Sequence, residues 1–275
     1  MFKVSVIIPV YNAAQFIKEA VVSALQQCQT GEILLIEDGS KDNSLDICKH
    51  LEFKYDKVFL YQHDCGKNKG ASESRNLGIK NAKFNYISFL DADDIYANNR
   101  FNESERLFNC HLDIDGVYEC AQYYNENKIY TINKSINPDK LLYYLIRGKY
   151  GHFHTNAITL KKAVFDKVGF FHPDLKLHQD TEMWLRLAHS CKLINGNLTE
   201  PVCFIRRHPG NRIWVGFSNE TRYKAYYNFF LWLKGKKISI LNLMLLIRKI
   251  AKLKAAMNKS FWIKEFILLL HKSNE

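Results

Sequence analysis

Four short runs that are apolar along most of their length recur between Val4 and Leu90, and segments with helical spacing separate them. The apolar runs are Val4–Val10, Glu32–Asp38, Val58–His63 and Asn85–Leu90. The helical segments are Ala13–Gln27, Asn43–Lys54 and Ala71–Ala82. Strands that are apolar throughout need cover on both faces, and helices between successive strands make those strands parallel. This alternation predicts an α/β fold on a mainly parallel sheet.

Polar side chains follow three of these runs at the point where each run ends. Tyr11 and Asn12 come after the first, Asp38 ends the second, and Asp91 and Asp93 follow the fourth. In open parallel sheets, ligands bind outside the carboxyl ends of the strands. The sequence therefore predicts a ligand site at this edge of the sheet.

Three carboxylates crowd the end of the fourth run, at Asp91, Asp93 and Asp94. Carboxylates this close repel one another, and burying them unpaired is costly, so either water solvates them or a cation joins them. Asp91 and Asp93 alternate in an extended segment, so their side chains point the same way. Such a pair can hold Mg²⁺ or Mn²⁺ together with phosphate oxygens. A solvated acidic turn is the alternative.

Two further residues have a functional and a structural interpretation. Asp38 can accept hydrogen bonds from a ribose or a base, but an aspartate in such a turn also caps helices without any ligand. Arg75 lies one turn into a helix and can pair with phosphate or base oxygens. A solvent-exposed helix arginine is the alternative there.

The pattern changes near Asp113. The sequence predicts a strand over Asp115–Asn125, a helix near Pro138–Arg147, and a strand followed by a helix within Asn156–Gly169. Further elements are expected in the second half: a helix over Asp180–Ser190 and a strand leading into a loop within Glu200–Asn211. After about residue 218 the chain is expected to be helical and basic.

The composition suits a globular chain with an anionic partner. The 275 residues are 47% hydrophobic and 24% charged, with a formal net charge of +11. Nucleotide phosphates, nucleic acid or an anionic membrane surface would complement that charge. Seven cysteines, with no Cys-x-x-Cys pair, indicate reduced and mostly buried thiols in a cytosolic protein. Neither a signal peptide nor a membrane-spanning helix is expected.

Four motifs occur in the order that a known enzyme family has them. They are VSVIIPVYNAAQFIKEAVVSALQQ, EILLIEDGSKDNS, NKGASESRNLGIKNAKFNYISFLDADD and HQDTEMWLRLA. Over roughly Lys3 to Asn211 the chain resembles the family 2 glycosyltransferases, which have the GT-A fold. The resemblance implies a GT-A catalytic domain over residues 1–215, with a nucleotide-sugar half (1–112) and an acceptor half (113–215). A basic helical region would follow over residues 216–275.

The resemblance also implies the donor chemistry. Members bind a nucleotide-sugar, usually UDP-linked, and invert the anomeric centre. Pro9, Val10 and Tyr11 would pack on the base. The other donor-side roles implied are Asp38 on the base or ribose, Arg75 on the nucleotide, Asp91 on the ribose or metal side, and Asp93 as a ligand of Mn²⁺ or Mg²⁺.

On the acceptor side, the family usually has Glu-Asp before a Trp-x-Arg-Leu-type helix, and the Asp is the general base. Here the pair is Gln179-Asp180, so the Asp is kept and the Glu is not. A helix cap is the structural alternative for Asp180. The resemblance implies further contacts: a third metal ligand or phosphate donor at His208, and acceptor or phosphate contacts at Arg206, Arg207 and Trp184.

The resemblance implies an inverting glycosyltransferase that acts on a glycan or lipid-linked acceptor, and the habit of the family implies a setting in assembly of a surface polysaccharide or lipopolysaccharide. The rivals are a sugar nucleotidyltransferase, whose Gly-rich basic signature is missing, and a non-catalytic basic binding module. Nucleic acid is not the expected partner, because no recognised motif accompanies the charge. Oligomerisation stays open.

The tail carries its own prediction. Lys234–Lys264 holds nine Lys or Arg and no acid, interleaved with apolar residues. Ile240, Leu243, Ile247 and Ile250 fall on one side of the expected helix, as interfacial binding requires. A cytoplasmic protein held at the inner face of an anionic membrane is therefore expected. A helical bundle packed on the catalytic core is the alternative.

Overall fold

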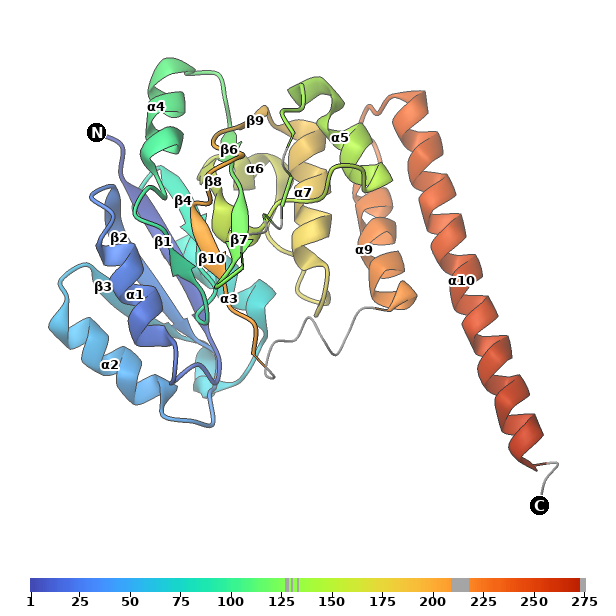
Figure 1. Ribbon diagram of the computed structural model, residues 1–275, viewed down its shortest axis with the longest axis horizontal. Helices are drawn as coiled ribbons and strands as arrows, with labels where there is room; N and C mark the ends of the chain where they lie inside the picture. Colours follow the sequence, from blue (N-terminus) through green and yellow to red (C-terminus); the bar gives the residue numbers. More distant parts are fainter. Residues whose placement is uncertain (127–128, 130, 133, 209–217, 273–275) are drawn as a thin grey trace.

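The structure is a computed structural model (Figure 1). It describes residues 1–126, 129, 131–132, 134–208 and 218–272, with the backbone alone for 258–272. A seven-stranded sheet with the order β3-β2-β1-β4-β8-β6-β9 forms the centre. Its strands are β1 (Val4–Val10), β2 (Thr30–Glu37), β3 (Val58–Gln62), β4 (Tyr86–Phe89), β6 (Gly116–Tyr118), β8 (Ile158–Lys161) and β9 (Leu193–Asn195).

The first four strands form the parallel part of the sheet. β1 pairs in parallel with both β2 and β4, and β2 pairs in parallel with β3. The helices between them are α1 (Ile17–Leu25), α2 (Ser44–Lys54) and α3 (Ala71–Asn81). β8 alone runs antiparallel, between β4 and β6, while β9 is parallel to β6. The predicted α/β architecture with a mainly parallel sheet is confirmed.

The sheet separates two hydrophobic clusters. Successive side chains of a strand point to opposite faces, and β1 and β2 follow that rule. Ile7 and Leu34 join the cluster that also contains Ile79 of α3, whereas Ile8 and Leu35 join the cluster of α1. Helices therefore cover both faces, as the apolar strands require.

The predicted strand over Asp115–Asn125 is wrong as a single element. It divides into β6 and β7 (Ala121–Tyr123), which belong to different sheets. β7 joins β5 (Ile95–Tyr96) and β10 (Cys203–Ile205) in a three-stranded sheet. Between β6 and β7, the Glu119 backbone N–H donates to Ala157 and that of Cys120 donates to Asn197. The Glu119 side chain at this point is buried.

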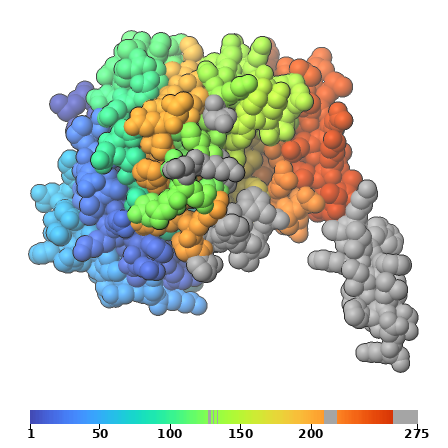
Figure 2. Space-filling model, in the orientation of Figure 1, coloured from blue at the N-terminus to red at the C-terminus, as the bar shows by residue number. Residues whose placement is uncertain are grey.

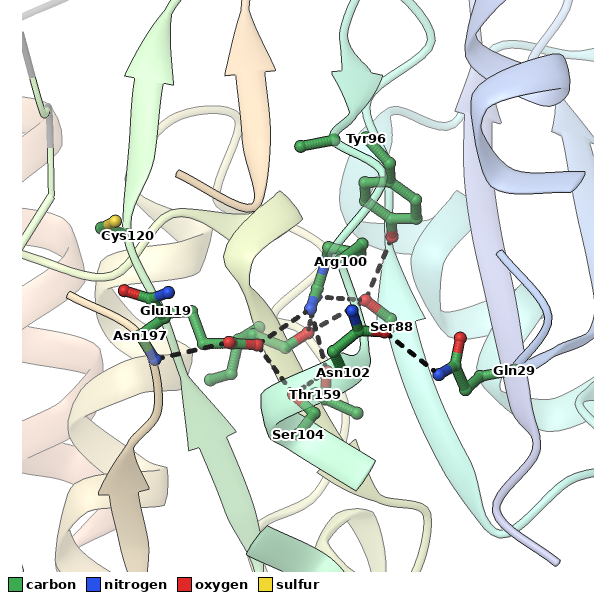
Figure 3. Close-up of polar contacts among 12 residues, drawn as sticks. Gln29, Ser88, Tyr96, Arg100, Asn102, Ser104, Glu119, Cys120, Thr159 and Asn197 are labelled. Carbon is green, nitrogen blue, oxygen red and sulfur yellow. Dashed lines mark hydrogen bonds and ion pairs between the residues drawn. The ribbon is translucent and has the colours of Figure 1, made fainter. Parts of the chain in front are cut away.

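A buried polar network lies at that division (Figure 3). The Arg100 guanidinium, with no exposed surface, is 3.4 Å from the Glu119 carboxylate and donates to Ser88 Oγ at 2.7 Å. Ser104, from α4 (Asn102–Cys110), donates to Glu119 at 2.8 Å. Burial raises the pKa of Glu119 to about 7. The network joins Ser88 of β4, which lies three residues before Asp91, to Glu119 after β6 and to Thr159 of β8.

The second half adds helices beyond the sheet. They are α5 (Pro138–Arg147), α6 (Val164–Val168), α7 (Gln179–Ser190), α9 (Asn219–Trp232) and α10 (Ile240–Lys272). The upper part of α10 packs against α9 and α5, and Figure 2 shows its red surface against theirs. Leu246 and Leu253 of α10 are buried in the same cluster as Trp184 of α7. This part of the tail is therefore continuous with the core.

All seven cysteines are free thiols, as expected. The expectation that most are buried is wrong, because Cys28, Cys65 and Cys110 are exposed on the surface. Among the described residues, no helix has the length and apolar character needed to span a membrane.

Candidate functional site

A cleft of about 1060 Å³ opens at the carboxyl ends of the parallel strands. It continues from there between α7 and α9. The predicted site residues in its lining are Pro9, Val10, Tyr11, Asp38, Arg75, Asp91, Asp93, Asp180, Trp184 and His208. Residues from both halves of the chain thus share one cavity, whereas Arg206 and Arg207 do not line it.

Asp38 serves the loop that leads into α3. Its carboxylate accepts from the backbone N–H groups of Lys69 at 2.6 Å and Gly70 at 2.9 Å, and the side chain is almost fully buried. Gly39 follows with φ +70°, and a side chain there would collide with the backbone of Gly66 and Asn68. Asp38 thus binds the start of a helix from another segment, and any nucleotide contact would use its remaining lone pairs.

Arg75 connects the two halves of the cleft. Its guanidinium donates to Asp91 Oδ1 at 2.7 Å. With the Gln179 amide nitrogen facing two carbonyl oxygens, the amide oxygen accepts from Arg75 at 3.1 Å. Arg75 is almost fully buried, so the alternative of a solvent-exposed helix arginine is wrong. The arginine joins the carboxylates after β4 to the residue that precedes Asp180.

The three carboxylates after β4 occupy different surroundings. Asp94 is buried and accepts from Asn156 Nδ2 at 2.6 Å and from the Arg206 backbone N–H at 2.8 Å. Burial, together with the neighbouring carboxylates, raises the pKa of Asp94 well above its usual value. Burial and Asp91 also raise the pKa of Asp93. The alternative of a solvated acidic turn is therefore wrong, and the cluster holds repelling charges that a cation would compensate.

Two histidines approach these carboxylates. His208 Nε2 is 3.0 Å from Asp93 Oδ2, and its ring packs against Phe16 with 4.8 Å between the ring centroids. His154 has a potential ligand atom that, together with atoms of Asp91 and Asp94, forms a group within 4.8 Å. Burial lowers the pKa of His154 to about 4, which keeps the imidazole neutral at pH 7, as metal ligation requires.

The donor set suits a hard divalent cation. Mn²⁺ binds both carboxylate oxygens and imidazole nitrogen, whereas Mg²⁺ binds the carboxylate oxygens. Two neighbouring sets are present, Asp93 with His208 and Asp91 with Asp94 and His154. Sequence reasoning placed Asp94 in the acidic cluster without assigning it as a ligand, and it did not select His154. The position of Asp94 next to Asp93 was a signal in the sequence. His154 lies far from these residues in the chain, and only the folded structure brings it near them.

Arg206 and Arg207 have partners of their own. Arg206 pairs with Glu19 at 2.6 Å and lies over the rings of Phe16 and Tyr124. Arg207 pairs with Glu126 at 2.8 Å. Both arginines therefore have structural roles beside the cleft, and their contact with phosphate stays a prediction.

Asp180 lies in the first turn of α7. The N-cap position belongs to His178, so the alternative of Asp180 as the cap is wrong. His178 has φ 60°, a left-handed conformation that costs a non-glycine residue about 1–3 kcal/mol. Asp180 Oδ1 accepts from the Thr181 backbone N–H at 2.7 Å. A strained residue thus begins the helix whose first turn presents Asp180 to the cleft.

Trp184 is a core residue at the wall of the cleft. Its side chain is 2% exposed, and its ring packs edge-on against Phe153 and Phe171. Its indole N–H has no acceptor among the described residues. The cleft continues past Trp184 to Arg222 and Tyr226 of α9, which sequence reasoning did not select.

A family model described as "Glycosyl transferase family 2" matches residues 5–169, more than half of the chain. The chain belongs to glycosyl transferase family 2. The family match covers the whole parallel part of the sheet and the acid cluster. A Rickettsia felis protein described as an uncharacterized glycosyltransferase is 34% identical over 191 residues, which are 67% of this chain and 31% of that protein. The chain therefore spans only part of that relative's length.

Solved structures support the same fold for this family 2 glycosyltransferase. S. aureus TarS 1-349, in complex with UDP-GlcNAc, matches with a TM-score of 0.71 at 17% identity, over 91% of this chain and 71% of that one. The mannosyltransferase PcManGT from Pyrobaculum calidifontis, in complex with GDP-Man and Mn²⁺, matches with a TM-score of 0.61 at 16% identity, over 98% and 80%. The predicted GT-A fold is thereby confirmed.

Proposed function

We propose that the protein is an inverting, metal-dependent glycosyltransferase that moves a sugar from a nucleotide-sugar, most simply a UDP-sugar, to a hydroxyl acceptor. The observation that carries this proposal is the pair of contacts made by Arg75. One joins the carboxylates after β4 at 2.7 Å, and the other joins Gln179 at 3.1 Å. A metal and diphosphate site and a base for the acceptor would thus face the same cavity.

The donor would lie across the carboxyl ends of β1, β2 and β4. Pro9, Val10 and Tyr11 line the cleft beside Asp38 and provide a surface for a flat base. Arg75 would contact the nucleotide, because its hydrogen bond to Asp91 fixes the position of the guanidinium. The two structural neighbours carry UDP-GlcNAc and GDP-Man, which supports a nucleotide-sugar without choosing the base or the sugar.

Asp93 and His208 would hold the cation, with Asp91 beside them and Asp94 and His154 as the alternative set. A bound dication would neutralise the charge that develops on the leaving diphosphate. Asp94 would anchor the loop, because both of its oxygens already accept hydrogen bonds from Asn156 and Arg206. The Mn²⁺ in the mannosyltransferase neighbour is consistent with this role.

Asp180 would act on the acceptor. Its carboxylate would take the proton of the attacking hydroxyl while that oxygen forms a bond to the anomeric carbon. The bond from that carbon to the diphosphate oxygen breaks on the opposite face, which inverts the configuration. General-base assistance of this kind contributes about 10²–10⁴-fold in rate.

A thermal-shift screen of nucleotide-sugars with Mn²⁺ tests the proposal, because a ligand that binds the folded state stabilises it. Stabilisation by one UDP- or GDP-sugar and slow release of the nucleoside diphosphate are expected. Production of pyrophosphate from UTP and a sugar 1-phosphate would instead support a nucleotidyltransferase. Binding of nucleic acid without binding of any nucleotide would support a basic binding module.

We further propose that α10 brings the enzyme to an anionic membrane surface, where a lipid-linked glycan acceptor of a surface polysaccharide or lipopolysaccharide would be available. An exposed apolar strip supports this proposal. Ile240, Leu241, Met244 and Ile247 have 78%, 58%, 64% and 50% of their surfaces exposed. Exposed Arg248 and Lys252 belong to the same stretch of helix, a combination that suits an interface with anionic lipid.

A further inference from the structure

The cleft extends well beyond the acid cluster, into a region outside the proposed donor site. Its walls there come from α5, α7 and α9. The residues that line this far half include Leu145, Gly148, Trp184, Leu185, Ala225 and Tyr226. These side chains are apolar or aromatic, which suits the flat face of a sugar ring. The only described carboxylate in the cleft outside the donor end is Asp180.

Arg222 is a cation in the wall of this far half. It lies in the first turn of α9, it is half-buried, and it lines the cleft. Among the described residues, no carboxylate forms an ion pair with its guanidinium, and no side-chain hydrogen bond engages it. A partly desolvated guanidinium without a counter-charge is unfavourable, so the site favours an anion.

A second cation approaches from the helix behind. Lys249 of α10 is partly buried, and its ammonium lies 5.3 Å from the centre of the Tyr226 ring. The same ammonium is 3.9 Å from the point where a side chain on Gly148 would begin. Burial lowers the pKa of Lys249, and the charges of Arg222 and Lys252 lower it further. Like charges therefore gather here, and no salt bridge within the described part of the chain relieves Lys249.

Arg222 also lies on the acceptor side of the reaction. Burial lowers the pKa of His178, which lies two residues before Asp180. The charge of Asp180 opposes this effect, and the charge of Arg222 adds to it. The donor diphosphate, by contrast, belongs with Asp93 and His208 in the proposed function. The indole N–H of Trp184, a residue of the same wall, is buried and has no acceptor among the described residues.

We propose that this far half of the cleft is a subsite for an oxyanion, a phosphate or a carboxylate, on the acceptor sugar. Arg222 binds the oxyanion, and Lys249 adds charge from behind. Trp184 and Tyr226 contact the ring that carries it. The inference rests on the proposed function, and it specifies the acceptor as an anionic glycan. A charge-assisted hydrogen bond is worth about 1.5–3 kcal/mol, or roughly 10- to 100-fold in affinity.

Binding is tested on the full chain with UDP and Mn²⁺ at saturation, so that the donor site is filled. Glucose, glucose 6-phosphate and glucuronate are titrated in turn, with the tryptophan indole N–H resonances followed by NMR. Both anions are expected to bind at least 10-fold more tightly than glucose and to shift an indole resonance. If neither anion binds more tightly than glucose, the proposal is wrong.

Three variants of α9 provide the matched comparison. Arg222→Gln is expected to reduce anion affinity about 10-fold or more, and Arg222→Lys to restore part of it. Lys224→Gln removes the same charge from an exposed residue that pairs with Glu220, and it should bind anions like wild type. Equal anion affinity in Arg222→Gln and Lys224→Gln, with both folded, would overturn the assignment.

Two more arms separate the causes. UDP affinity in the presence of Mn²⁺ reports the donor site alone. If the wild type does not bind UDP, that result counts against the proposed function rather than against this subsite. Dihexanoyl phosphatidate carries the phosphate on a lipid. Tighter, Arg222-dependent binding of this lipid than of glucose 6-phosphate would assign the anion to a lipid-linked acceptor, and the reverse order to a soluble or glycan phosphate.

Discussion

Asp93 and Asp94 are neighbours in the chain but are held differently. Asp93 contacts His208 at 3.0 Å and lines the cleft, whereas Asp94 is buried against Asn156 and the Arg206 backbone. We predict that Asp93→Asn abolishes the gain in UDP affinity that Mn²⁺ gives and leaves the melting temperature unchanged or higher, because it removes a repelling carboxylate. Calorimetric titration of UDP with and without Mn²⁺ measures the first effect.

Asp94→Asn is the control for that experiment. It should lower the melting temperature, because an amide nitrogen would face the donors that the carboxylate now accepts from. If Mn²⁺ dependence survives in Asp93→Asn and disappears in a folded Asp94→Asn, then the ligands are Asp91, Asp94 and His154.

A second prediction concerns Asp180. Asp180→Asn should bind the nucleotide-sugar with nearly unchanged affinity and transfer the sugar about 10²–10⁴-fold more slowly, because the proton of the acceptor loses its base. Asp174→Asn removes a charge from an 89% exposed side chain a few residues earlier and should behave as wild type. Single-turnover transfer at saturating acceptor makes the comparison. Wild-type transfer by Asp180→Asn would restrict Asp180 to a structural role.

The buried Glu119 predicts a pH dependence of stability. Burial raises its pKa from 4.5 to about 7, so the folded state binds more protons than the unfolded state between those values. This contribution to the free energy of unfolding is therefore full below about pH 4.5 and is lost as pH rises through 7. Urea unfolding at pH 5 and pH 8 should give a smaller difference for Glu119→Gln than for wild type. An unchanged difference would show that Glu119 is charged throughout.

The sequence predicted the residues of the donor end better than their contacts. Tyr11 and Asp93 line the cleft because they follow parallel strands, a position that sequence pattern reveals, and Arg75 lines it from the start of α3. His154 and Arg222 were not selected, since they reach the cleft through packing of segments far apart in the chain. The sequence left Asp38 as either a nucleotide ligand or a helix cap. In the structure it accepts hydrogen bonds at the start of α3, a helix of a different segment.

At the scale of elements, apolar runs and helical spacing predicted β1, β2, β3 and β4 with errors of two residues or fewer at each end. α1 begins at Ile17 rather than Ala13, after a turn in which Asn12 has φ 50°. The antiparallel orientation of β8, whose strand was predicted, and the division of β6 from β7 were not predicted. A buried network between Arg100 and Glu119, whose members lie in separate segments, is found beside both features.

The exposed strip of α10 gives an element-scale prediction. The full chain should float with vesicles that contain anionic lipid, less so in high salt, because each Lys or Arg near such a surface contributes about 1 kcal/mol. Met244→Ser together with Ile247→Ser should reduce flotation, since both side chains are exposed and their loss leaves the core intact. Truncation is a poor test, because Leu246 and Leu253 pack in the core.

The matched control for flotation is Phe53→Ser on α2. Phe53 is 92% exposed, and it lies outside the basic tail. This variant should float like wild type. If the wild type stays unbound with anionic vesicles at low salt, the membrane proposal is wrong and α10 has a structural role only.

At the scale of the whole molecule, one cleft collects residues from the parallel sheet, from α7 and from α9. The helices after residue 218 form part of its wall and pack on the core, so they complete the cavity in which both substrates would meet. We propose that a cation and a nucleotide occupy the end of this cleft beside β4. The proposed roles of Asp180 and Arg222 on the acceptor depend on a donor that is bound at that end of the cleft.

A crystal structure of the full chain with UDP and Mn²⁺, with data collected near the manganese absorption edge, measures this claim directly. We predict an anomalous peak within about 2.5 Å of an Asp93 carboxylate oxygen, with the uracil against Tyr11 and the diphosphate on the peak. UDP bound elsewhere, or a peak that contacts none of the carboxylates after β4, would contradict the account.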